Sequence, residues 1–266
     1  MKARLSRKVA VITGAGSSSD GIGTGQAISI ALAREGCKVL LVDIDSERVA
    51  NTLSIIEAEG GSAQVFIGDI TQEIVAKEMI NYAVSCFGTL DILVNNLGVM
   101  FYGDVLTASE HDWEESYRLN VRSMIYSSKY AITILEQQRQ GSIINLSSTA
   151  GLFGFPLRSP YAASKWAIIG ITKTLAMELG EYNIRVNAIC PGSVSGDRMK
   201  KVINAKAKSL GISAEEVQKD YESYVSLGTF VDKEDIANMA VFLLSQEAHK
   251  ITGQVMTVDG YTERMS

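Results

Sequence analysis

The sequence is poor in the residues that build disulfide frameworks, metal sites and histidine-dependent active sites. Its 266 residues include three cysteines and two histidines. Cys37, Cys86 and Cys190 are far apart in the chain and form no C-x-x-C pattern, so neither a disulfide framework nor a zinc site is indicated, and we expect buried, reduced thiols. His111 and His249 have no carboxylate cluster near them in sequence. We therefore expect both at the surface and no metal site.

Proline, long apolar runs and net charge are also scarce. Three prolines and the lack of a low-complexity stretch give no linker, so we expect one domain over residues 1–266. A net charge of −5 leaves no electrostatic footprint for nucleic acid. The apolar run that begins at Val9 is too short for a signal peptide or a membrane span. We expect a cytoplasmic protein with no nucleic-acid or membrane partner.

Short apolar runs rich in β-branched residues alternate with longer helical patterns along the chain. The alternation is typical of parallel strands joined by right-handed crossovers. It predicts an α/β fold, a doubly wound (Rossmann) seven-stranded parallel sheet with helices on both faces. The expected strands are Val9–Thr13, Lys38–Asp43, Ala63–Phe66, Leu90–Asn95, Gly141–Ser147, Arg185–Ile189 and Gln254–Val258. The expected helices are Gly21–Glu35, Ser46–Glu59, Gln72–Phe87, Ser109–Leu135, Tyr161–Leu179 and Lys233–Leu244.

The most informative residues are Tyr161 and Lys165, four apart in a helical pattern, with Ser148 thirteen residues before the tyrosine. Residues four apart share a helix face, so the Lys165 ammonium can lie near the phenol and favour its ionised form. A free tyrosine has a pKa of about 10. A cation roughly 4 Å away, at an effective dielectric constant of about 20, contributes on the order of 4 kcal/mol as an upper bound. The three side chains predict a proton-transfer site in which the phenol is a usable base.

A glycine-rich segment from Gly14 to Gly23 follows the first expected strand. Missing side chains let backbone N–H groups and a helix N-terminus approach a pyrophosphate. Ser17 or Ser18 can add a hydroxyl contact to phosphate. Asp43 ends the second strand twenty residues after Gly23, where a carboxylate accepts hydrogen bonds from both ribose hydroxyls of an adenosine and repels a 2′-phosphate. The sequence therefore predicts NAD, rather than NADP, as the cofactor.

Taken in order, these motifs resemble the short-chain dehydrogenase/reductase family over roughly Lys8 to Gly260. The resemblance is carried by Gly14, Gly21, Ile22, Gly23, Asp43, the pair Asn95-Asn96, Asn120, Ser148, Tyr161, Lys165 and the pair Pro191-Gly192. It implies that Tyr161 is the general base in alcohol oxidation, that Lys165 lowers its pKa and binds the nicotinamide ribose, and that Ser148 holds the substrate oxygen. Asn120 completes a proton relay, since a buried amide that distorts its helix can hold a water molecule.

The resemblance also implies the remaining cofactor contacts. Asp69 and Ile70 border the adenine, and Val194, just after Pro191-Gly192, meets the nicotinamide amide. The ribose is walled by the residues after the fourth strand, which are Asn95, Asn96, Leu97 and Gly98. Leu97 replaces the family's usual alanine, and we expect it to narrow the pocket.

Two further positions depart from the family pattern. Six residues separate Gly14 from Gly21 where the family has three, which lengthens the loop by three and leaves the first phosphate contact undefined. Gly196 stands where the family commonly has a threonine. A hydroxyl contact to the carboxamide is then missing, unless Ser193 or Ser195 supplies it.

The resemblance implies an NAD-dependent oxidoreductase that transfers a hydride between the nicotinamide and a secondary alcohol or ketone, with a polyol, a sugar derivative or a hydroxy acid as substrate. A 3-oxoacyl-thioester reductase and a non-catalytic nucleotide-sensing protein are the alternatives. The long helices Ser109–Leu135 and Tyr161–Leu179 resemble those that form four-helix subunit contacts in the family, so we expect a homotetramer.

A long insertion at residues 196–227 follows the sixth strand, and ordered insertions of this length are usually functional. The resemblance makes it the substrate lid, and an oligomer contact is the alternative. Its basic start, Arg198–Lys208, and Arg158 on the opposite wall lead us to expect a substrate with an anionic group or several hydroxyls. A solvated helix face is the alternative interpretation of that basic run.

Overall fold

The structure is a computed structural model that describes residues 3–17 and 23–262. Its strands are β1 (Val9–Thr13), β2 (Lys38–Asp43), β3 (Ser62–Ile67), β4 (Ile92–Asn95), β5 (Gly141–Leu146), β6 (Ile184–Pro191) and β7 (Val255–Val258). They form one sheet in the order β3-β2-β1-β4-β5-β6-β7, in which every neighbouring pair is parallel. The strand order reverses between β1 and β4. Open α/β sheets bind ligands beside the carboxyl ends of the strands at such a point.

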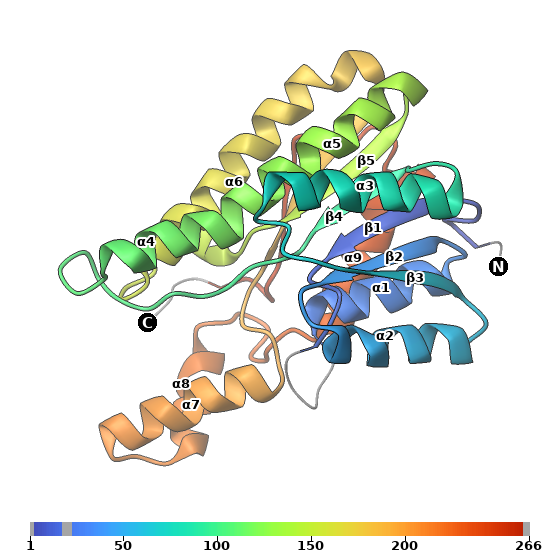
Figure 1. Cartoon of the computed structure of the whole chain (residues 1–266). Helices are drawn as coiled ribbons and strands as arrows, with labels where there is room; N and C mark the ends of the chain where they lie inside the picture. Colours follow the sequence, from blue (N-terminus) through green and yellow to red (C-terminus); the bar gives the residue numbers. More distant parts are fainter. Residues whose placement is uncertain (1–2, 18–22, 263–266) are drawn as a thin grey trace.

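Helices cover both faces of this sheet (Figure 1). One face carries α1 (Thr24–Arg34), α2 (Ser46–Ala58) and α9 (Lys233–Leu244). The other carries α3 (Glu73–Phe87), α5 (Ser123–Gln138) and α6 (Ser159–Glu178). The predicted doubly wound parallel fold is confirmed, and most expected elements differ from the observed ones by a few residues at their ends.

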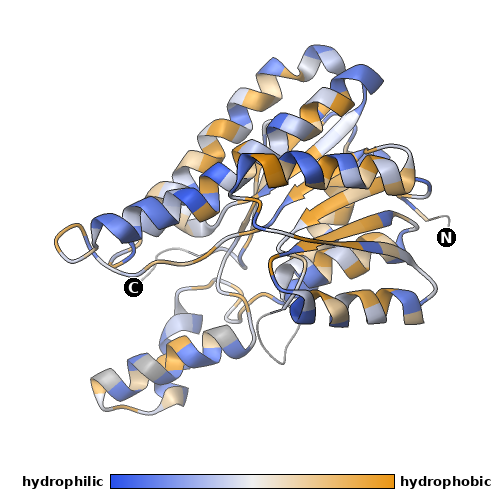
Figure 2. Ribbon diagram, in the orientation of Figure 1, coloured by the Kyte–Doolittle hydropathy of each residue, from blue (hydrophilic) through white to orange (hydrophobic). Residues whose placement is uncertain are grey.

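The strands are apolar on both sides because each side faces a layer of helices. In β1, Ala10 and Ile12 point into the core shared with α1 and α9, whereas Val11 points into the core shared with α3 and α5. All three are fully buried. Figure 2 shows the apolar sheet between helices that carry polar residues on their outer faces. Burial on both sides explains why these strands read as continuous apolar runs rather than as alternating patterns.

The expected helix Ser109–Leu135 is interrupted in the structure. It divides into α4 (Glu110–Tyr117), a π-helical turn η1 (Arg118–Arg122) and α5. Asn120 lies in this wider turn, where its side chain bonds the backbone of Val99 in a neighbouring loop. Single π-turns are frequent at functional sites. This π-helical turn is the helix distortion that we expected at Asn120, whereas the end of α4 at Tyr117 was not expected, because the apolar period does not reveal one extra residue in a turn.

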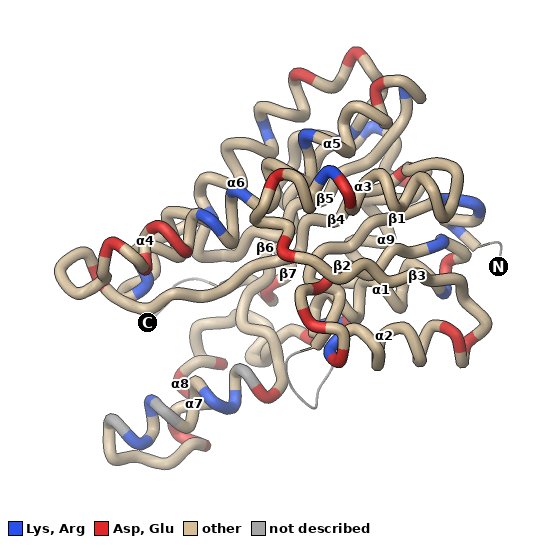
Figure 3. Tube along the Cα trace, viewed as in Figure 1, with Lys and Arg blue, Asp and Glu red and all other residues tan. Residues whose placement is uncertain are grey.

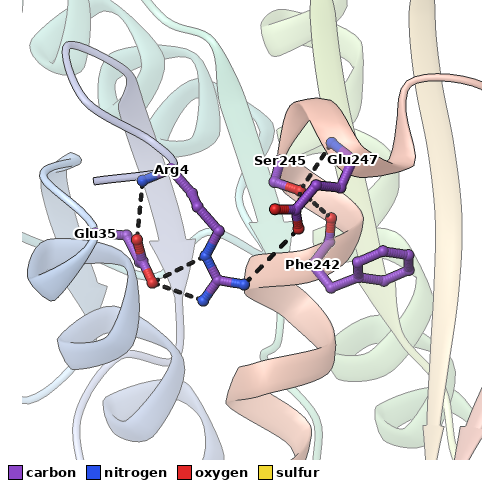
Figure 4. A network of polar contacts seen from close by, with 5 residues as sticks. All are labelled: Arg4, Glu35, Phe242, Ser245 and Glu247. Carbon is purple, nitrogen blue, oxygen red and sulfur yellow. Dashed lines mark hydrogen bonds and ion pairs between the residues drawn. The ribbon is translucent and has the colours of Figure 1, made fainter. Parts of the chain in front are cut away.

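α1 and α9 lie side by side and run in the same direction. Arg4 contacts Glu35 just after α1 (Nη2–Oε1, 2.6 Å) and Glu247 just after α9 (Nη1–Oε2, 3.9 Å), as Figure 4 shows. The hydrogen bond from this guanidinium lowers the pKa of the Glu35 carboxyl. Since the C-terminal ends of the two helices meet here, their N-terminal ends lie together at the opposite edge of the sheet.

The expected lid forms two helices, α7 (Asp197–Leu210) and α8 (Ala214–Ser223). A small apolar cluster holds them together and consists of Ile203, Ala207 and Val217. The backbone N–H of Ser195 donates to Val231 (2.9 Å), and the N–H of Val231 donates to the carbonyl of Ser193 (3.1 Å). The two ends of the lid are therefore joined side by side at the sheet.

Two of the three thiols are buried as expected. Burial raises the pKa of the Cys190 thiol to about 11 and raises that of the Cys37 thiol as well. The expectation was wrong for Cys86, which is exposed on α3. His111 and His249 are exposed. No helix in the described ranges is long and apolar enough to span a bilayer, and the same residues contain no grouping of three or more His, Cys, Asp or Glu side chains that fits a metal ion.

Candidate active site and cofactor cleft

A cleft open to solvent lies beside the carboxyl ends of β1, β4, β5 and β6, with an empty volume of about 1570 Å³. The glycine-rich side is lined by Gly14, Gly16, Ser17, Gly23, Thr24 and Gly25. The middle is lined by Asn96, Gly98, Ser148, Tyr161, Lys165, Pro191, Gly192 and Val194. The lid contributes Met199, Val202 and Tyr221. Most of the residues that the sequence assigned to one site are thus brought together on the walls of one cleft.

Tyr161 and Lys165 face this cleft from α6, as their spacing predicted. Their exposed fractions are 8% and 4%. The Lys165 ammonium donates to the carbonyl of Leu146 at the end of β5 (2.9 Å) and lies 5.6 Å from the centre of the Tyr161 ring. A Cβ at position 98 would come within 3.1 Å of the same ammonium. Gly98 therefore leaves the space that the lysine occupies.

Two neighbouring serines fix the end of β5 against α6. The Ser147 hydroxyl donates to the backbone carbonyl of Lys165 (2.8 Å). A Cβ at Gly151 would come within 2.8 Å of that carbonyl oxygen, so the close approach requires glycine. The Ser148 hydroxyl accepts a hydrogen bond from the N–H of Ala150 (3.2 Å) and lines the cleft. The sequence singled out Ser148 and assigned no positioning part to Ser147 or Gly151.

Asn120 connects three segments behind the cleft. It is 1% exposed. Its Oδ1 accepts from the N–H of Val99 (2.7 Å), and its Nδ2 donates to the carbonyl of Val99 (2.9 Å) and to the Ser164 hydroxyl (2.9 Å). Ser164 in turn donates to the carbonyl of Tyr161 (2.7 Å). The amide thus ties the loop after β4 to the first turn of α6, and Ser164 is a link that the sequence did not identify.

The glycine that packs most tightly at the cofactor end is Gly25, which the sequence did not assign. A Cβ there would lie 2.1 Å from the carbonyl oxygen of Gly14 and 2.4 Å from Nδ2 of Asn96. We expected this helix to begin at Gly21, but α1 begins at Thr24. Gly25 provides the close packing between helix and strand that this type of turn requires. Ser18, Gly21 and Ile22 lie outside the described residues.

The N-terminus of α1 lines the cleft through Gly23, Thr24 and Gly25. Its first flanking residue, Gly23, supplies no side-chain cap to the helix, and Gly14, Gly16 and Thr24 line the same space. The first N–H groups of a helix have no partner within the helix, and they attract anions. The bare backbone at this end therefore fits the pyrophosphate of a dinucleotide.

Asp43 is held as a fixed acceptor at the end of β2. Its Oδ2 accepts from the N–H of Gly16 (3.0 Å), and its Oδ1 accepts from the N–H groups of Ile44 (2.9 Å) and Asp45 (3.2 Å). Arg48 was not considered from the sequence and packs against Gly16, but its guanidinium pairs with Asp45 (Nε–Oδ2, 3.1 Å). Arg48 is thus engaged with another carboxylate, and Asp43 forms no ion pair among the described residues.

Five of the predicted cofactor contacts that the structure describes do not line the cleft, namely Asp43, Asp69, Ile70, Asn95 and Leu97. Asn95 turns inward and donates to Asn145 (2.8 Å) and to Ser128 (3.1 Å), so its expected place at the ribose is wrong. Ile70 is 3% exposed and Leu97 packs against the same core. Neither residue narrows the cleft.

Asp69 also lies outside this lining, although it stands in a polar cluster of its own. Its Oδ1 accepts from the Thr71 hydroxyl (2.7 Å), and Arg118 lies 3.6 Å from its Oδ2. Partial burial raises the pKa of the Asp69 carboxyl, but the hydrogen bonds from Thr71 and the charge of Arg118 outweigh burial and lower the pKa overall.

The substrate half of the cleft combines apolar side chains with Arg158. Its guanidinium lies 4.0 Å from the centre of the Tyr102 ring and 4.8 Å from that of Phe155, and its Nη1 is 2.8 Å from the Met100 sulfur. Arg158 forms no ion pair with any described carboxylate. A cation held between two aromatic rings remains available to a substrate group.

The lysines at the start of the lid do not line the cleft, contrary to our expectation that they meet the substrate. Figure 3 shows Lys and Arg residues in blue along α7. Lys200, Lys201 and Lys208 are exposed, and Lys206 pairs with Asp220 of α8 (Nζ–Oδ2, 3.5 Å). The side chain of Arg198 is not described. These four lysines do not line the cleft, so they form a largely solvated face, the alternative that the sequence left open.

Comparison with known proteins agrees with this geometry. A family model described as enoyl-(acyl carrier protein) reductase matches residues 16–262. Two proteins of Thermotoga maritima are similar: an uncharacterized oxidoreductase is 36% identical over 95% of this chain and 96% of its own length, and a 3-oxoacyl-[acyl-carrier-protein] reductase is 34% identical over 97% and 98%. A crystal structure of NAD⁺-bound xylitol dehydrogenase superposes with a TM-score of 0.90, at 29% identity over 97% of this chain and 100% of that one.

The chain belongs to the short-chain dehydrogenase/reductase family. It is an oxidoreductase of that family, whose relatives act on alcohols and ketones.

Proposed function

We propose that the protein is an NAD-dependent dehydrogenase that oxidises a secondary alcohol on a polyol, a sugar derivative or a hydroxy acid, or reduces the corresponding ketone. One observation carries the proposal. Ser148, Tyr161 and Lys165 line the same cleft as the uncapped N-terminus of α1, so a proton-transfer group and a pyrophosphate site share one space.

In the oxidation direction, Tyr161 takes the proton of the substrate hydroxyl while Ser148 donates a hydrogen bond to the same oxygen. Lys165 favours the phenolate through its charge, because its ammonium lies on the same face of α6. Asn120 holds the loop at Val99 and the start of α6 in register, which positions Tyr161. A bound nicotinamide supplies the hydride acceptor.

The preference for NAD rests on Asp43. Its carboxylate is oriented by three backbone N–H groups, which leave one lone pair of Oδ2 for a hydroxyl of an adenosine ribose. A 2′-phosphate would meet this negative charge. The xylitol dehydrogenase of similar fold was crystallised with NAD⁺, which agrees with this choice.

The proposal is tested by incubating the purified protein with NAD⁺ or NADP⁺ and a panel of polyols, sugars, hydroxy acids and hydroxyacyl thioesters, while NADH or NADPH formation is followed by absorbance. We expect turnover with NAD⁺ and at least one polyol, sugar or hydroxy acid. The absence of turnover with every alcohol, together with normal NADH binding, would contradict the proposal and favour a nucleotide-sensing protein.

A 3-oxoacyl-thioester reductase is the second candidate, and the similarity to the Thermotoga maritima carrier-protein reductase supports it. The exposed lysines of α7 offer a positive surface to an acidic carrier. The two candidates are separated in the reducing direction. Faster reduction of an acetoacetyl thioester with NADPH than oxidation of any free alcohol with NAD⁺ would favour this second candidate.

We also propose that the protein assembles as a homotetramer through α4, α5 and α6. Large apolar side chains remain exposed on these helices, among them Trp113, Trp166 and Met177. Exposed apolar surface of this kind marks subunit contacts. A monomeric mass by light scattering at micromolar concentration would refute the assembly.

A further inference from the structure

Lys233 is a cation of the cleft that neither the sequence nor the comparisons assign. It is the first residue of α9, is half-buried, and lines the same cleft as Thr24 and Gly25. It forms no ion pair with any described carboxylate. Its long side chain therefore brings a positive charge into the cleft without a partner among the described acids.

The ammonium of Lys233 lies next to the position that the missing side chain of Gly196 would occupy. A Cβ at Gly196 would come 3.1 Å from Nζ and 3.3 Å from Cε of Lys233. The backbone of Gly196 also has a φ of +126°, which side-chain-bearing residues rarely adopt. Position 196 thus has a glycine with a lysine beside it from another element.

The stability of α9 does not explain a lysine at its first position. The N-terminus of a helix favours negative charge. In α9 this requirement is met by Asp232 and Asp235, which form a capping box, and by Glu234 in the first turn. A cation among them opposes the helix dipole, so its placement calls for a role outside the helix.

The two helix N-termini face the same space. α1 and α9 run side by side in the same direction, so the uncapped start of α1 and Lys233 lie at one edge of the sheet. Both groups are electropositive. Asp197 also lines the cleft, and Lys200 lies near its carboxylate (Nζ–Oδ1, 3.8 Å). An anion between the N-terminus of α1 and Lys233 would neutralise both.

We propose that the Lys233 ammonium binds the pyrophosphate of the dinucleotide. The proposal rests on the proposed function in one respect, namely that the cleft binds a nicotinamide dinucleotide. It adds a residue from α9 to a phosphate site otherwise lined by Gly14, Gly16, Ser17 and the start of α1.

The test measures binding rather than turnover. NADH and ADP-ribose, which has the pyrophosphate but no nicotinamide, are titrated into the wild type and Lys233→Met by fluorescence and calorimetry. We expect the Kd of both ligands to rise by the same factor, roughly tenfold, because a hydrogen bond between two charged groups is lost. The salt dependence of binding should also weaken, since fewer charges are paired.

Two variants control for charge and for folding. Lys200→Met removes an equal charge from the lid, where the side chain is 75% exposed, and should leave both Kd values within about twofold. Lys233→Arg keeps a cation and should retain most of the affinity. Thermal melting of Lys233→Met should match that of the wild type, because the residue makes no ion pair that the fold uses.

The remaining outcomes overturn the proposal. A rise in Kd for NADH alone would place the contact at the nicotinamide. Unchanged Kd values for both ligands would exclude Lys233 from the cofactor site, and an equal loss in Lys200→Met would point to long-range electrostatics. If wild-type protein binds neither NADH nor ADP-ribose, the proposed function itself fails, which is distinct from a failure confined to Lys233→Met.

Discussion

Replacement of Gly25 by alanine adds one methyl group at the tightest point between α1 and β1. The new Cβ would lie 2.1 Å from the carbonyl oxygen of Gly14, whereas real Cβ contacts essentially never fall below 3.0 Å. The two backbones must therefore separate by about 0.9 Å. The new Cβ and the carbonyl oxygen of Gly14 are both attached directly to the backbone, so neither can turn away as the end of a flexible side chain could. A second clash of the Cβ with Nδ2 of Asn96, at 2.4 Å, limits the direction in which the two backbones can separate.

The loss of stability in Gly25→Ala follows from two opposing contributions. Overpacking of this kind costs about 1–3 kcal/mol, and alanine returns up to about 1 kcal/mol through its higher helix propensity. A net loss of about 1–2 kcal/mol lowers the Tm by roughly 2–8 °C in a chain of this size. The effect on the cofactor is larger, since Gly14 and Thr24 line the same cleft and a displacement near 1 Å weakens a positioned contact by roughly ten- to a hundredfold.

The assay combines thermal melting with NADH titration of Gly25→Ala. The matched control is Gly180→Ala, which adds the same methyl where nothing lies within 4 Å, and it should leave stability within about 0.5 kcal/mol of the wild type and NADH affinity unchanged. A Gly25→Ala protein that melts and binds NADH like the wild type would show that α1 and β1 are not in the close contact on which this reasoning rests.

Four further predictions address the chemistry and the fold. Tyr161→Phe removes the ionisable oxygen, so turnover should be lost while the Kd for NADH stays within about twofold; normal turnover would eliminate the base. Asp43 should give a higher kcat/KM with NAD⁺ than with NADP⁺, and Asp43→Ala should reduce that ratio, so a wild-type preference for NADP⁺ would refute the assignment. Arg158→Ala should raise KM for an anionic substrate and leave that for a neutral alcohol of similar size nearly unchanged, with Lys200→Met as the exposed control; equal effects on both substrates would assign the arginine to loop structure. The pKa of Glu35 is lowered by its guanidinium partner, so the stability that this pair adds is complete above the ordinary carboxyl pKa of about 4.3 and is lost as pH falls through the lowered value; Glu35→Gln should therefore melt below the wild type at pH near 7, and the gap in Tm should narrow as the pH falls below about 4.3.

The five inner strands were predictable from the sequence because β1, β2, β4, β5 and β6 are buried on both sides. Two-sided burial produces unbroken apolar runs such as Val9–Thr13 and Lys38–Asp43, whose observed bounds equal the expected ones. The pair Tyr161 and Lys165 was predictable for a similar reason, since helical periodicity alone decides that residues four apart share a face. In both cases the information is local in the chain.

Contacts between distant segments were harder to foresee. The need for glycine at Gly25 could not be foreseen, because the clash there depends on Gly14 and Asn96, which belong to other segments of the chain. The inward turn of Asn95 toward Asn145 depends on the pairing of β4 with β5. Neither partner is visible from the local pattern.

The positively charged residues show the same difference between a pattern that is local in the chain and a position that depends on the fold. The sequence drew attention to the basic run of α7 because its cations are dense within Arg198–Lys208, but charged side chains are mostly exposed, and Lys200, Lys201 and Lys208 are exposed. Arg158 and Lys233 stand apart from that run and line the cleft. Because desolvation makes a partly buried cation costly without a counter-charge, we expect anionic ligand groups to meet the isolated cations of the cleft rather than the dense ones of the lid.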